Sequence, residues 1–195
     1  MIKSVLSCTM LSVLGLSALG LCALGLPAFV RAADPHDHED HVVDEAVAVI
    51  VPTKASGGNV GGAITLKREK GYVLVTGEVT GLKPGKHGFH IHMFGDLRSP
   101  DGMSAGGHYN PHNLPHGGPD AKEHHEGDLG NIEANAQGVA KVDVKATGVD
   151  LHHIVGRSIV VHADADDLKS QPAGNAGPRI GVGAIALVAP PAPKK

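Results

Sequence analysis

Two histidines, His90 and His92, lie two residues apart in the stretch HGFHIHMFGD. The stretch is typical of a strand, in which successive side chains point to opposite faces, so both imidazoles project to the same side. A third histidine, His162, ends the apolar run SIVVH. Because imidazole nitrogens on a rigid scaffold suit Cu(II) in a planar or tetragonal arrangement, these three residues predict part of a copper site.

A second group of metal-ligand residue types lies in the long polar stretch at 95–128. It offers three imidazoles and one carboxylate, which is a donor set suited to tetrahedral zinc. A single histidine is more often a surface or core residue than a ligand, so the prediction depends on the clustering. If one imidazole faced both groups through its two ring nitrogens, it would bridge the two metals. The members of this second group are His108, His116, His125 and Asp128, with His108 as the bridging candidate.

The first residues of the chain are typical of a secretory signal peptide. Lys3 precedes a long apolar run, and Val30 and Ala32 occupy the −3 and −1 places of a cleavage site. We therefore predict a signal peptide at 1–32. The alternative is an uncleaved membrane anchor, because an apolar run of roughly 25 residues could also span a bilayer.

Composition narrows the functional classes. Both cysteines, Cys8 and Cys22, lie in the predicted signal peptide, so the exported chain must rely on its core and on metal for stability. Cleavage also removes two positive charges, Lys3 and Arg31, and no negative one, so the net charge of −3 becomes −5. An acidic chain of this kind disfavours nucleic acid as a partner.

The rest of the chain shows the rhythm of short strands. Apolar or alternating runs recur between glycine, proline, asparagine and aspartate, which indicates an all-β sandwich or barrel. Aromatic residues are only 3% and tryptophan is absent, so the core must consist of valine, isoleucine, leucine and alanine. Two long polar stretches, at 95–128 and 163–181, interrupt the rhythm, and loops of this length are usually functional or disordered. The eight runs are EAVAVIVP, GGAITLKRE, YVLVTGEV, HGFHIHMF, GNIEANA, GVAKVDVKA, GRSIVVHA and GVGAIALVA.

Four segments follow from these patterns. After the signal peptide, residues 33–42 form an acidic, histidine-rich arm without apolar periodicity. Residues 43–189 form the β domain, and residues 190–195 form a tail with proline and lysine that cannot continue a sheet. The arm either captures copper or zinc outside the cytoplasm or is a solvated linker. Its histidines are His36, His38 and His41.

Six strings of the sequence resemble the copper/zinc superoxide dismutase family, in the same order and with compatible spacing. They are GFHIHMFGD, SAGGHYNP, HGGP, GDLGN, GRSIVVHADADDL and GNAGPRIGVGAI. The resemblance covers nearly the whole chain from residue 43 to residue 189. It implies an eight-stranded Greek-key β-barrel, an immunoglobulin-like sandwich with two long functional loops.

The resemblance also implies roles for individual residues. Two ligand sets share His108, which bridges copper and zinc, and Asp166 bonds one histidine of each set, His90 and His116. Arg179 in GNAGPR matches the arginine beside the copper that attracts and positions superoxide. The implied catalytic residues are therefore His108 and Arg179. The implied copper ligands are His90, His92, His108 and His162, and the implied zinc ligands are His108, His116, His125 and Asp128.

The activity implied by the resemblance is the conversion of superoxide to oxygen and hydrogen peroxide, by alternate reduction and oxidation of the copper. His108 would deliver a proton to the peroxide product, and zinc would hold its imidazole and tune its affinity for metal and proton. The alternative from another class is an exported copper/zinc-binding protein without turnover.

Partners and location follow from the same reading. We expect superoxide as the substrate, no nucleic acid, and no stable membrane partner unless the leader is uncleaved. Assembly as a homodimer is left open. The leader predicts an exported protein, in the bacterial periplasm first, with secretion or membrane anchoring as alternatives.

Some positions depart from the family pattern. The family usually ties the first long loop to the barrel with a disulfide, but Gly102 and Val182 occupy the places of those cysteines. A missing cross-link of this kind forgoes about 2–4 kcal/mol, so we expect packing and the zinc site to hold the loop. The second loop, LKSQPAGNAGPR, is shorter than in many relatives, and Ala173 replaces a hydroxyl residue of the channel. We therefore expect weaker long-range steering of superoxide.

Overall fold

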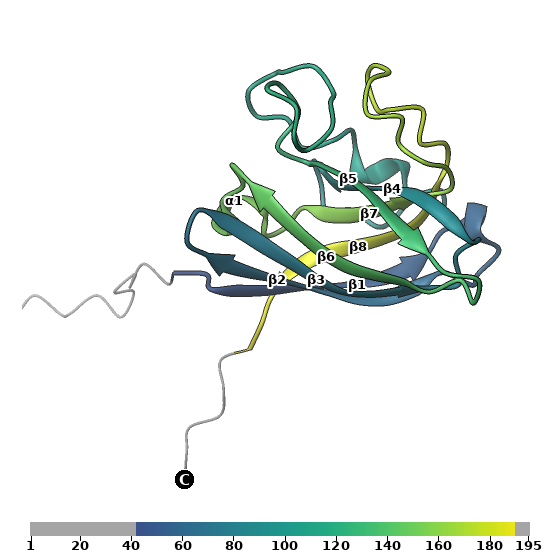
Figure 1. Ribbon diagram of the computed structural model, residues 1–195. Coiled ribbons are helices and arrows are strands. Elements are labelled where there is room, and N and C mark those ends of the chain that lie inside the picture. The colour runs from purple at the N-terminus through teal and green to yellow at the C-terminus, as the bar shows by residue number, and fades with distance from the viewer. Residues whose placement is uncertain (1–41, 190–195) are drawn as a thin grey trace, which may run out of the picture. The chain divides into compact units, whose positions relative to one another are not determined.

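The computed structural model describes residues 42–189 of the chain. Its strands are β1 (Glu45–Pro52), β2 (Gly61–Glu69), β3 (Tyr72–Thr80), β4 (Gly85–His92), β5 (Asp128–Ala134), β6 (Ala140–Thr147), β7 (Ser158–His162) and β8 (Arg179–Leu187). They close into an antiparallel barrel in the order β1-β2-β3-β6-β5-β4-β7-β8 (Figure 1). Because β3 pairs with β6 and β4 pairs with β7, the connections have Greek-key character. The predicted all-β, eight-stranded Greek-key barrel is therefore confirmed.

The strands form where the alternation of side chains predicts them. In β1, Ala46, Ala48 and Ile50 are buried, whereas Val49 and Val51 face outward. All eight predicted runs overlap strands, and β1 and β2 begin and end at the predicted residues. Burial of one branched aliphatic side chain contributes about 1.5–3 kcal/mol, so many such residues stabilise the barrel without tryptophan.

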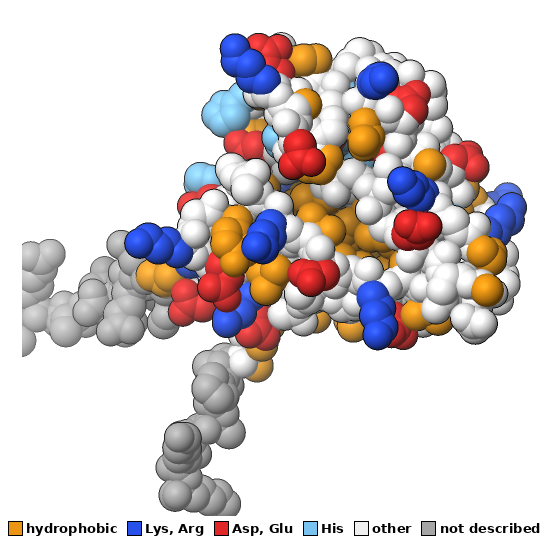
Figure 2. Space-filling model, in the orientation of Figure 1, with side chains coloured by type: hydrophobic (Ala, Val, Ile, Leu, Met, Phe, Trp, Pro, Cys, Tyr) orange, Lys and Arg blue, Asp and Glu red, His pale blue; other side chains and the backbone are white. Residues whose placement is uncertain are grey.

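The barrel is closed weakly between two of its strands. Strands β5 and β6 pair only at Ala134 and Ala140, next to the turn that joins them. Beyond this pair the strands separate, and Figure 2 shows apolar side chains in a hollow on this face, beneath the two long loops. On the same face, acidic and basic side chains are interspersed rather than grouped by sign.

Three short elements interrupt the strand pattern. Helix α1 (Leu151–Ile154) follows Asp150, whose side chain accepts a hydrogen bond from the backbone N–H of His152, so a normal N-cap starts this single turn. The sequence analysis did not predict this helix. The other two are the 3-10 turns η1 (Lys54–Ser56) and η2 (Met103–Ala105).

Two long loops cover the outer side of the barrel along β4, β5 and β7 (Figure 1). We call residues 93–127, between β4 and β5, the first loop and residues 163–178, between β7 and β8, the second loop. On β4, Phe89 and Ile91 are buried in the main core, and His90 and His92 are buried on the opposite face. The imidazoles are therefore shielded from water by the loops and not by the core.

Several predicted segments lie outside the described residues. They are the signal peptide at 1–32, the arm at 33–42 except for its last residue, and the tail at 190–195. Between residues 42 and 189, no helix is long and apolar enough to cross a membrane.

Candidate metal centre

The first cluster of imidazoles comes from two neighbouring strands and the first loop. His90 and His92 lie on β4, and His162 ends β7, which pairs with β4. A backbone bridge between His92 and His108 brings the first loop to the same place. All four side chains are buried, and each offers a nitrogen within 4.8 Å of the others.

Hydrogen bonds determine which ring nitrogen of each imidazole is left for a metal. Nδ1 of His92 donates to the carbonyl of Gly106 at 2.8 Å, and Nδ1 of His162 donates to the carbonyl of Gly177 at 3.1 Å. Their Nε2 atoms, which then carry lone pairs, face each other at 3.4 Å. Two lone pairs at this distance repel unless a cation lies between them.

The two remaining imidazoles of this cluster have buried nitrogens that find no hydrogen-bond partner among residues 42–189. These atoms are Nδ1 of His90, whose Nε2 lies 2.8 Å from Asp166, and Nε2 of His108. A buried polar atom without a partner is costly, so the pocket fits a metal better than it fits the bare side chains. A donor set made only of imidazole nitrogens suits copper.

The second cluster surrounds one carboxylate oxygen. Oδ1 of Asp128 lies 2.7 Å from Nδ1 of His108, 3.0 Å from Nδ1 of His116 and 3.1 Å from Nδ1 of His125. The other oxygen, Oδ2, accepts hydrogen bonds from the backbone N–H groups of Gly117 and His125, which fixes the carboxylate. Three nitrogens and one oxygen form the donor set that tetrahedral zinc takes.

His116 gives the clearest sign of a missing cation in this second cluster. Its Nε2 faces Oδ1 of Asp166 at 3.0 Å, so the bound proton belongs on Nε2. Its Nδ1 is close to Asp128, but the geometry makes no hydrogen bond, and the nitrogen is buried without a partner. Proximity without alignment is the arrangement of two ligands that bind one ion.

Asp166 joins the two clusters. Oδ2 of Asp166 lies 2.8 Å from Nε2 of His90, and Oδ1 lies 3.0 Å from Nε2 of His116. The backbone of Asp166 is fixed in turn by Asn131, whose side chain donates to its carbonyl at 2.9 Å and accepts from its N–H at 2.8 Å. Carboxylates that bond metal-binding histidines fix their tautomer and ring orientation. One carboxylate here does so for both clusters.

Comparison with known proteins identifies the family. The family model described as copper/zinc superoxide dismutase matches residues 60–185, which is more than half of the chain. The chain belongs to the copper/zinc superoxide dismutase family. The family resemblance inferred from the sequence strings is thereby confirmed.

Two curated relatives show how similar this family member is to others. It is 40% identical over 159 residues to the extracellular superoxide dismutase (Cu-Zn) of Brugia pahangi, with 75% of this chain and 79% of the relative covered. It is 45% identical over 152 residues to superoxide dismutase (Cu-Zn) 3 of Arabidopsis thaliana, with 73% of this chain and 90% of the relative covered.

Burial sets the protonation of the first cluster of this superoxide dismutase family member. Burial lowers the pKa of His162 to about 3 and that of His108 to about 4, and it holds the pKa of His92 well below the usual value. The charge of Arg179 lowers the pKa of His92 and His162 further. The imidazoles of His92, His108 and His162 are therefore neutral at pH 7, which is the form that binds metal.

The second cluster has the opposite tendency in the metal-free protein. Burial alone would raise the pKa of Asp128, but the hydrogen bonds with His108 and His125 and the nearby His116 imidazole hold it far below the usual range. Burial alone would lower the pKa of His116, but its contacts with Asp128 and Asp166 raise it to about 9. A positive His116 imidazole thus offsets part of the negative charge of the two carboxylates.

We expect the metal-free protein to be most stable near pH 6.5, with stability falling toward lower pH and, more gradually, toward pH 9. His92, His108 and His162 have folded-state pKa values below the 6.5 of the unfolded chain, so their contribution to stability is lost as the pH falls below 6.5. The pKa of His116 is raised, so its contribution is complete below pH 6.5 and is lost as the pH rises through about 9. Urea unfolding of chelator-treated protein across pH 4–10 measures this, and stability that increases from pH 6 to pH 4 would contradict it.

Arg179, at the start of β8, is bonded to the first loop beside the first cluster. Its Nη1 donates to the carbonyl of Gly102 and its Nη2 to the carbonyl of Gly106, each at 2.6 Å. The carbonyl of Gly106 also accepts from His92, so one oxygen links the guanidinium to a candidate copper ligand. Burial lowers the pKa of Arg179 and Asp101 opposes this, but a guanidinium stays charged at neutral pH. The structure thus places a cation next to the first cluster.

Gly102 and Val182, which the family resemblance matches to the loop cysteines, lie side by side. A Cβ atom added to Gly102 would lie 2.9 Å from Cγ1 of Val182, and Gly102 has a φ of +74°, which favours glycine. Val182 forms a small apolar cluster with Ala105 of the first loop and Val160 of β7. Apolar contact thus replaces the cross-link at this point, in addition to the two hydrogen bonds from Arg179.

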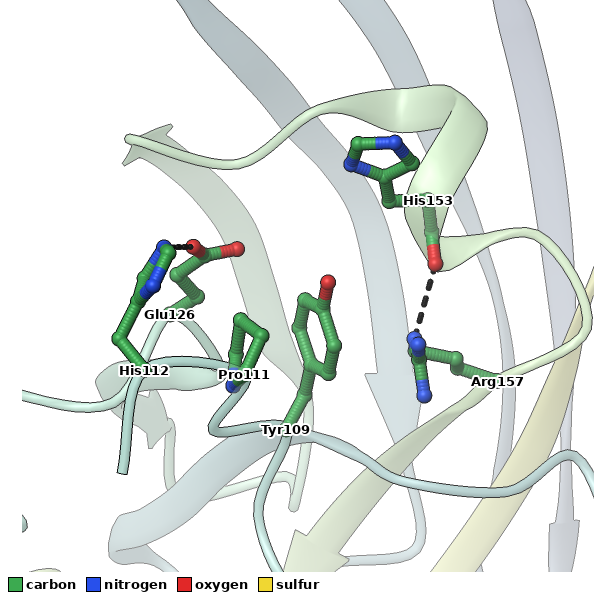
Figure 3. A pocket seen from close by; sticks show the side chains of 6 residues that line it. All are labelled: Tyr109, Pro111, His112, Glu126, His153 and Arg157. Carbon is green, nitrogen blue, oxygen red and sulfur yellow. Dashed lines mark hydrogen bonds and ion pairs between the residues drawn. The ribbon is translucent and has the colours of Figure 1, made fainter. Parts of the chain in front are cut away.

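A surface pocket anchors the other end of the first loop (Figure 3). The guanidinium of Arg157 lies over the ring of Tyr109, 3.9 Å from its centroid, and its Nε donates to the carbonyl of His153 at 2.8 Å. Across the pocket, Nε2 of His112 lies 2.9 Å from Oε1 of Glu126. These contacts join the first loop to α1. The pocket is lined by Tyr109, Pro111, His112, Glu126, His153 and Arg157, none of which is a predicted ligand.

Three residues around the centre were not singled out from the sequence. Asn131 holds the backbone of Asp166, as described above, and it lies within the string GDLGN. Gly174 packs on the contact between Asp166 and His116, where an added Cβ would lie 2.7 Å from Nε2 of His116. Its signal is the string GNAG. Gln171 bonds the backbone of His116, and no signal in the sequence indicates this.

Proposed function

We propose that this chain is an exported superoxide dismutase that converts superoxide to oxygen and hydrogen peroxide. The observation that supports it best is the pair of buried donor sets that share His108, with Asp166 bonded to both and Arg179 beside the first. Bound copper supplies one-electron exchange with superoxide, and bound zinc fixes the shared imidazole. In this proposal copper is held by His90, His92, His108 and His162, and zinc by His108, His116, His125 and Asp128.

Two residues of the chain act on the substrate. Arg179 attracts the superoxide anion and orients it by hydrogen bonding, because the guanidinium is a fixed cation held by two loop carbonyls. His108 takes up a proton at Nε2 and delivers it to the peroxide product, because this nitrogen is buried, faces the first cluster and has no hydrogen-bond partner within the described part of the chain. The covering loops exclude bulk water from the imidazoles.

The function is tested by superoxide consumption in protein reconstituted with copper and zinc. We expect turnover by the loaded protein and none by a His162→Ala variant, which lacks one nitrogen of the first cluster. Metal content must be measured in the same samples. Full occupancy of both metals without turnover would favour the alternative, an exported copper/zinc-binding protein that is not an enzyme.

Replacing Arg179 by alanine should lower kcat/KM for superoxide about tenfold, because the cation that raises the local concentration of the anion is removed. Arg179→Lys should retain part of the effect as a point charge without the planar donor pair. Arg98, which is exposed and paired with Asp96, is the matched control. The rates are compared at low and high ionic strength, and an Arg179→Ala enzyme with the native kcat/KM at equal copper content would contradict the role.

The proposal places the enzyme outside the cytoplasm, in the bacterial periplasm, after cleavage of residues 1–32. It is supported by the sequence of the leader and by a relative whose name describes an extracellular enzyme. Mass spectrometry of the N-terminus of the protein from fractionated cells decides it. A chain that keeps residues 1–32 and sediments with membranes would support the anchored alternative.

A homodimer is the assembly included in the proposal. It is supported by large apolar side chains that the single chain leaves exposed, including Val49 on β1 and Phe94 and Met103 of the first loop. No nucleic-acid partner is proposed, because the exported chain is acidic. Sedimentation velocity of the metal-loaded protein measures the mass, and a monomer at micromolar concentration would contradict the dimer.

A further inference from the structure

We propose that Gln171 is a positioning residue for His116, through which the second loop controls how long zinc is retained. The inference rests on the proposed function, because it takes His116 as a zinc ligand. Gln171 is itself exposed and belongs to neither donor set. Its effect on the zinc site therefore runs through His116.

The side-chain amide of Gln171 pairs with both backbone groups of His116. Oε1 accepts a hydrogen bond from the N–H of His116 at 2.8 Å, and Nε2 donates to the carbonyl of His116 at 2.8 Å. Only an amide carries the required acceptor and donor side by side. The two hydrogen bonds resemble those that a neighbouring strand would make to a residue of a β-sheet, and they join the second loop to the first.

His116 needs such a partner because it lies in an irregular part of the first loop. Within residues 42–189, neither its N–H nor its carbonyl makes a backbone–backbone hydrogen bond. Its ring is held at Nε2 by Asp166, which also belongs to the second loop. The second loop therefore fixes both the ring and the backbone of this ligand.

Hydrogen bonds within the second loop hold the residues on both sides of Gln171. Oδ1 of Asp167 accepts from the backbone N–H groups of Lys169 and Ser170, and Oδ2 accepts from the side chain of Asn175 at 3.0 Å. Nδ2 of Asn175 also donates to Oγ of Ser170 at 2.9 Å. These bonds tie a tight turn on either side of Gln171, so little further ordering is needed when it pairs with His116.

The two hydrogen bonds between Gln171 and the backbone of His116, which we call the clasp, affect the zinc site and not the copper site. The copper ligands His90, His92 and His162 lie on β4 and β7, and the backbone of His108 pairs with that of His92. Their positions do not depend on Gln171. Loss of the clasp should therefore increase the rate of zinc release and leave copper affinity unchanged.

The test compares Gln171→Met, which loses both hydrogen bonds to His116 and a longer one to the carbonyl of Lys169, with Gln171→Glu, which loses the donor and places a charge near a carbonyl. In protein loaded with copper and zinc, Gln171→Met should release zinc to a chromogenic chelator about tenfold faster, as expected for two lost neutral hydrogen bonds. Cobalt(II) placed in the zinc site should show an altered visible spectrum. Gln137→Met is the matched control, because the side chain of Gln137 is exposed in the turn between β5 and β6.

Three results would overturn the inference. One is a native rate of zinc release in Gln171→Met. Another is an equal loss of zinc and copper from Gln171→Met. The third is a fall of its melting temperature that is the same with and without metal. The last two results would mean that Gln171 stabilises the loop in general and does not act on the zinc site. The zinc content of the unaltered protein separates this inference from the proposed function. If the unaltered protein binds no zinc, both fail; if it binds zinc and Gln171→Met behaves as the native chain, only the role of Gln171 fails.

Discussion

Replacing Asp166 by asparagine should weaken copper binding about 10- to 100-fold and weaken zinc binding less, because this carboxylate bonds one histidine of each donor set. The asymmetry follows from a third contact. Oδ1 of Asp166 faces His116 and also accepts from the backbone N–H of Leu168 at 2.7 Å, whereas Oδ2 faces only His90. An asparagine will keep its single oxygen at the Oδ1 position, where two donors need it.

The amide nitrogen of that asparagine then faces His90, where the loss should be greatest. Two N–H groups cannot donate to each other, so His90 must move its proton from Nε2 to Nδ1. Nδ1 is the nitrogen that otherwise carries the lone pair for copper. The neutral amide thus selects the tautomer that cannot bind the metal. Asp166→Ala has no such selectivity and should weaken both metals.

Competition with chelators of known affinity, followed by metal analysis, gives the two affinities separately. The matched control is Asp143→Asn on β6, an exposed aspartate that contacts neither donor set. A fall in zinc affinity larger than the fall in copper affinity would show that the amide is oriented the other way. Unchanged affinity for both metals would remove Asp166 from the positioning of the ligands.

Sequence reasoning was strong where one residue type has few uses. Paired His90 and His92 on a strand, together with further imidazoles and Asp128 in a loop, indicate metal through the chemistry of the side chains alone. Eight alternating runs likewise predict the strands, because burial on one face forces a period of two. Both the clustered ligand types and the alternation of apolar residues can be read without knowing which residues meet in the folded chain.

The sequence does not predict contacts in which a side chain bonds a backbone group. Gln171 bonds the peptide groups of His116, and the carbonyl of Gly106 accepts from both His92 and Arg179. Every residue has these backbone groups, so no residue type marks such contacts. Helix α1 was missed for a related reason, since four residues are too short to show a helical period.

The missing cross-link is a third case, in which the sequence predicts where the disulfide is absent but not which contacts hold the loop instead. Comparison with the family pattern points to Gly102 and Val182, and the structure shows these two in contact. What replaces the disulfide is an apolar cluster with Ala105 and Val160, plus the bonds of Arg179 to two loop carbonyls. We call this set of contacts the latch. It consists of common residue types, whose role depends on the packing of the first loop, β7 and β8 against one another, so the sequence does not predict it.

Zinc holds the first loop together with this latch, so removing zinc should have the second large effect, on thermal stability. A chelator that removes zinc should lower the melting temperature by roughly 8–16 °C, whereas dithiothreitol should leave it unchanged. The estimate takes zinc at about 1,000 times its dissociation constant, which adds about 4 kcal/mol, with about 2–4 °C for each kcal/mol in a domain of this size. The physical reason is that zinc binds the folded arrangement, in which three histidines surround one oxygen of Asp128, and not the unfolded chain, so its binding free energy adds to the stability of the fold.

In a protein that begins at residue 33 the reductant has nothing to act on, because residues 33–195 contain no cysteine. Calorimetry of this 33–195 protein should therefore give the same curve with and without dithiothreitol, and a lower transition only with chelator. His116→Ala serves as a second route to the same state, since it deletes a zinc ligand and should make the melting temperature insensitive to chelator. A transition that shifts with dithiothreitol and not with chelator would mean that the first loop is held by something other than zinc and apolar packing.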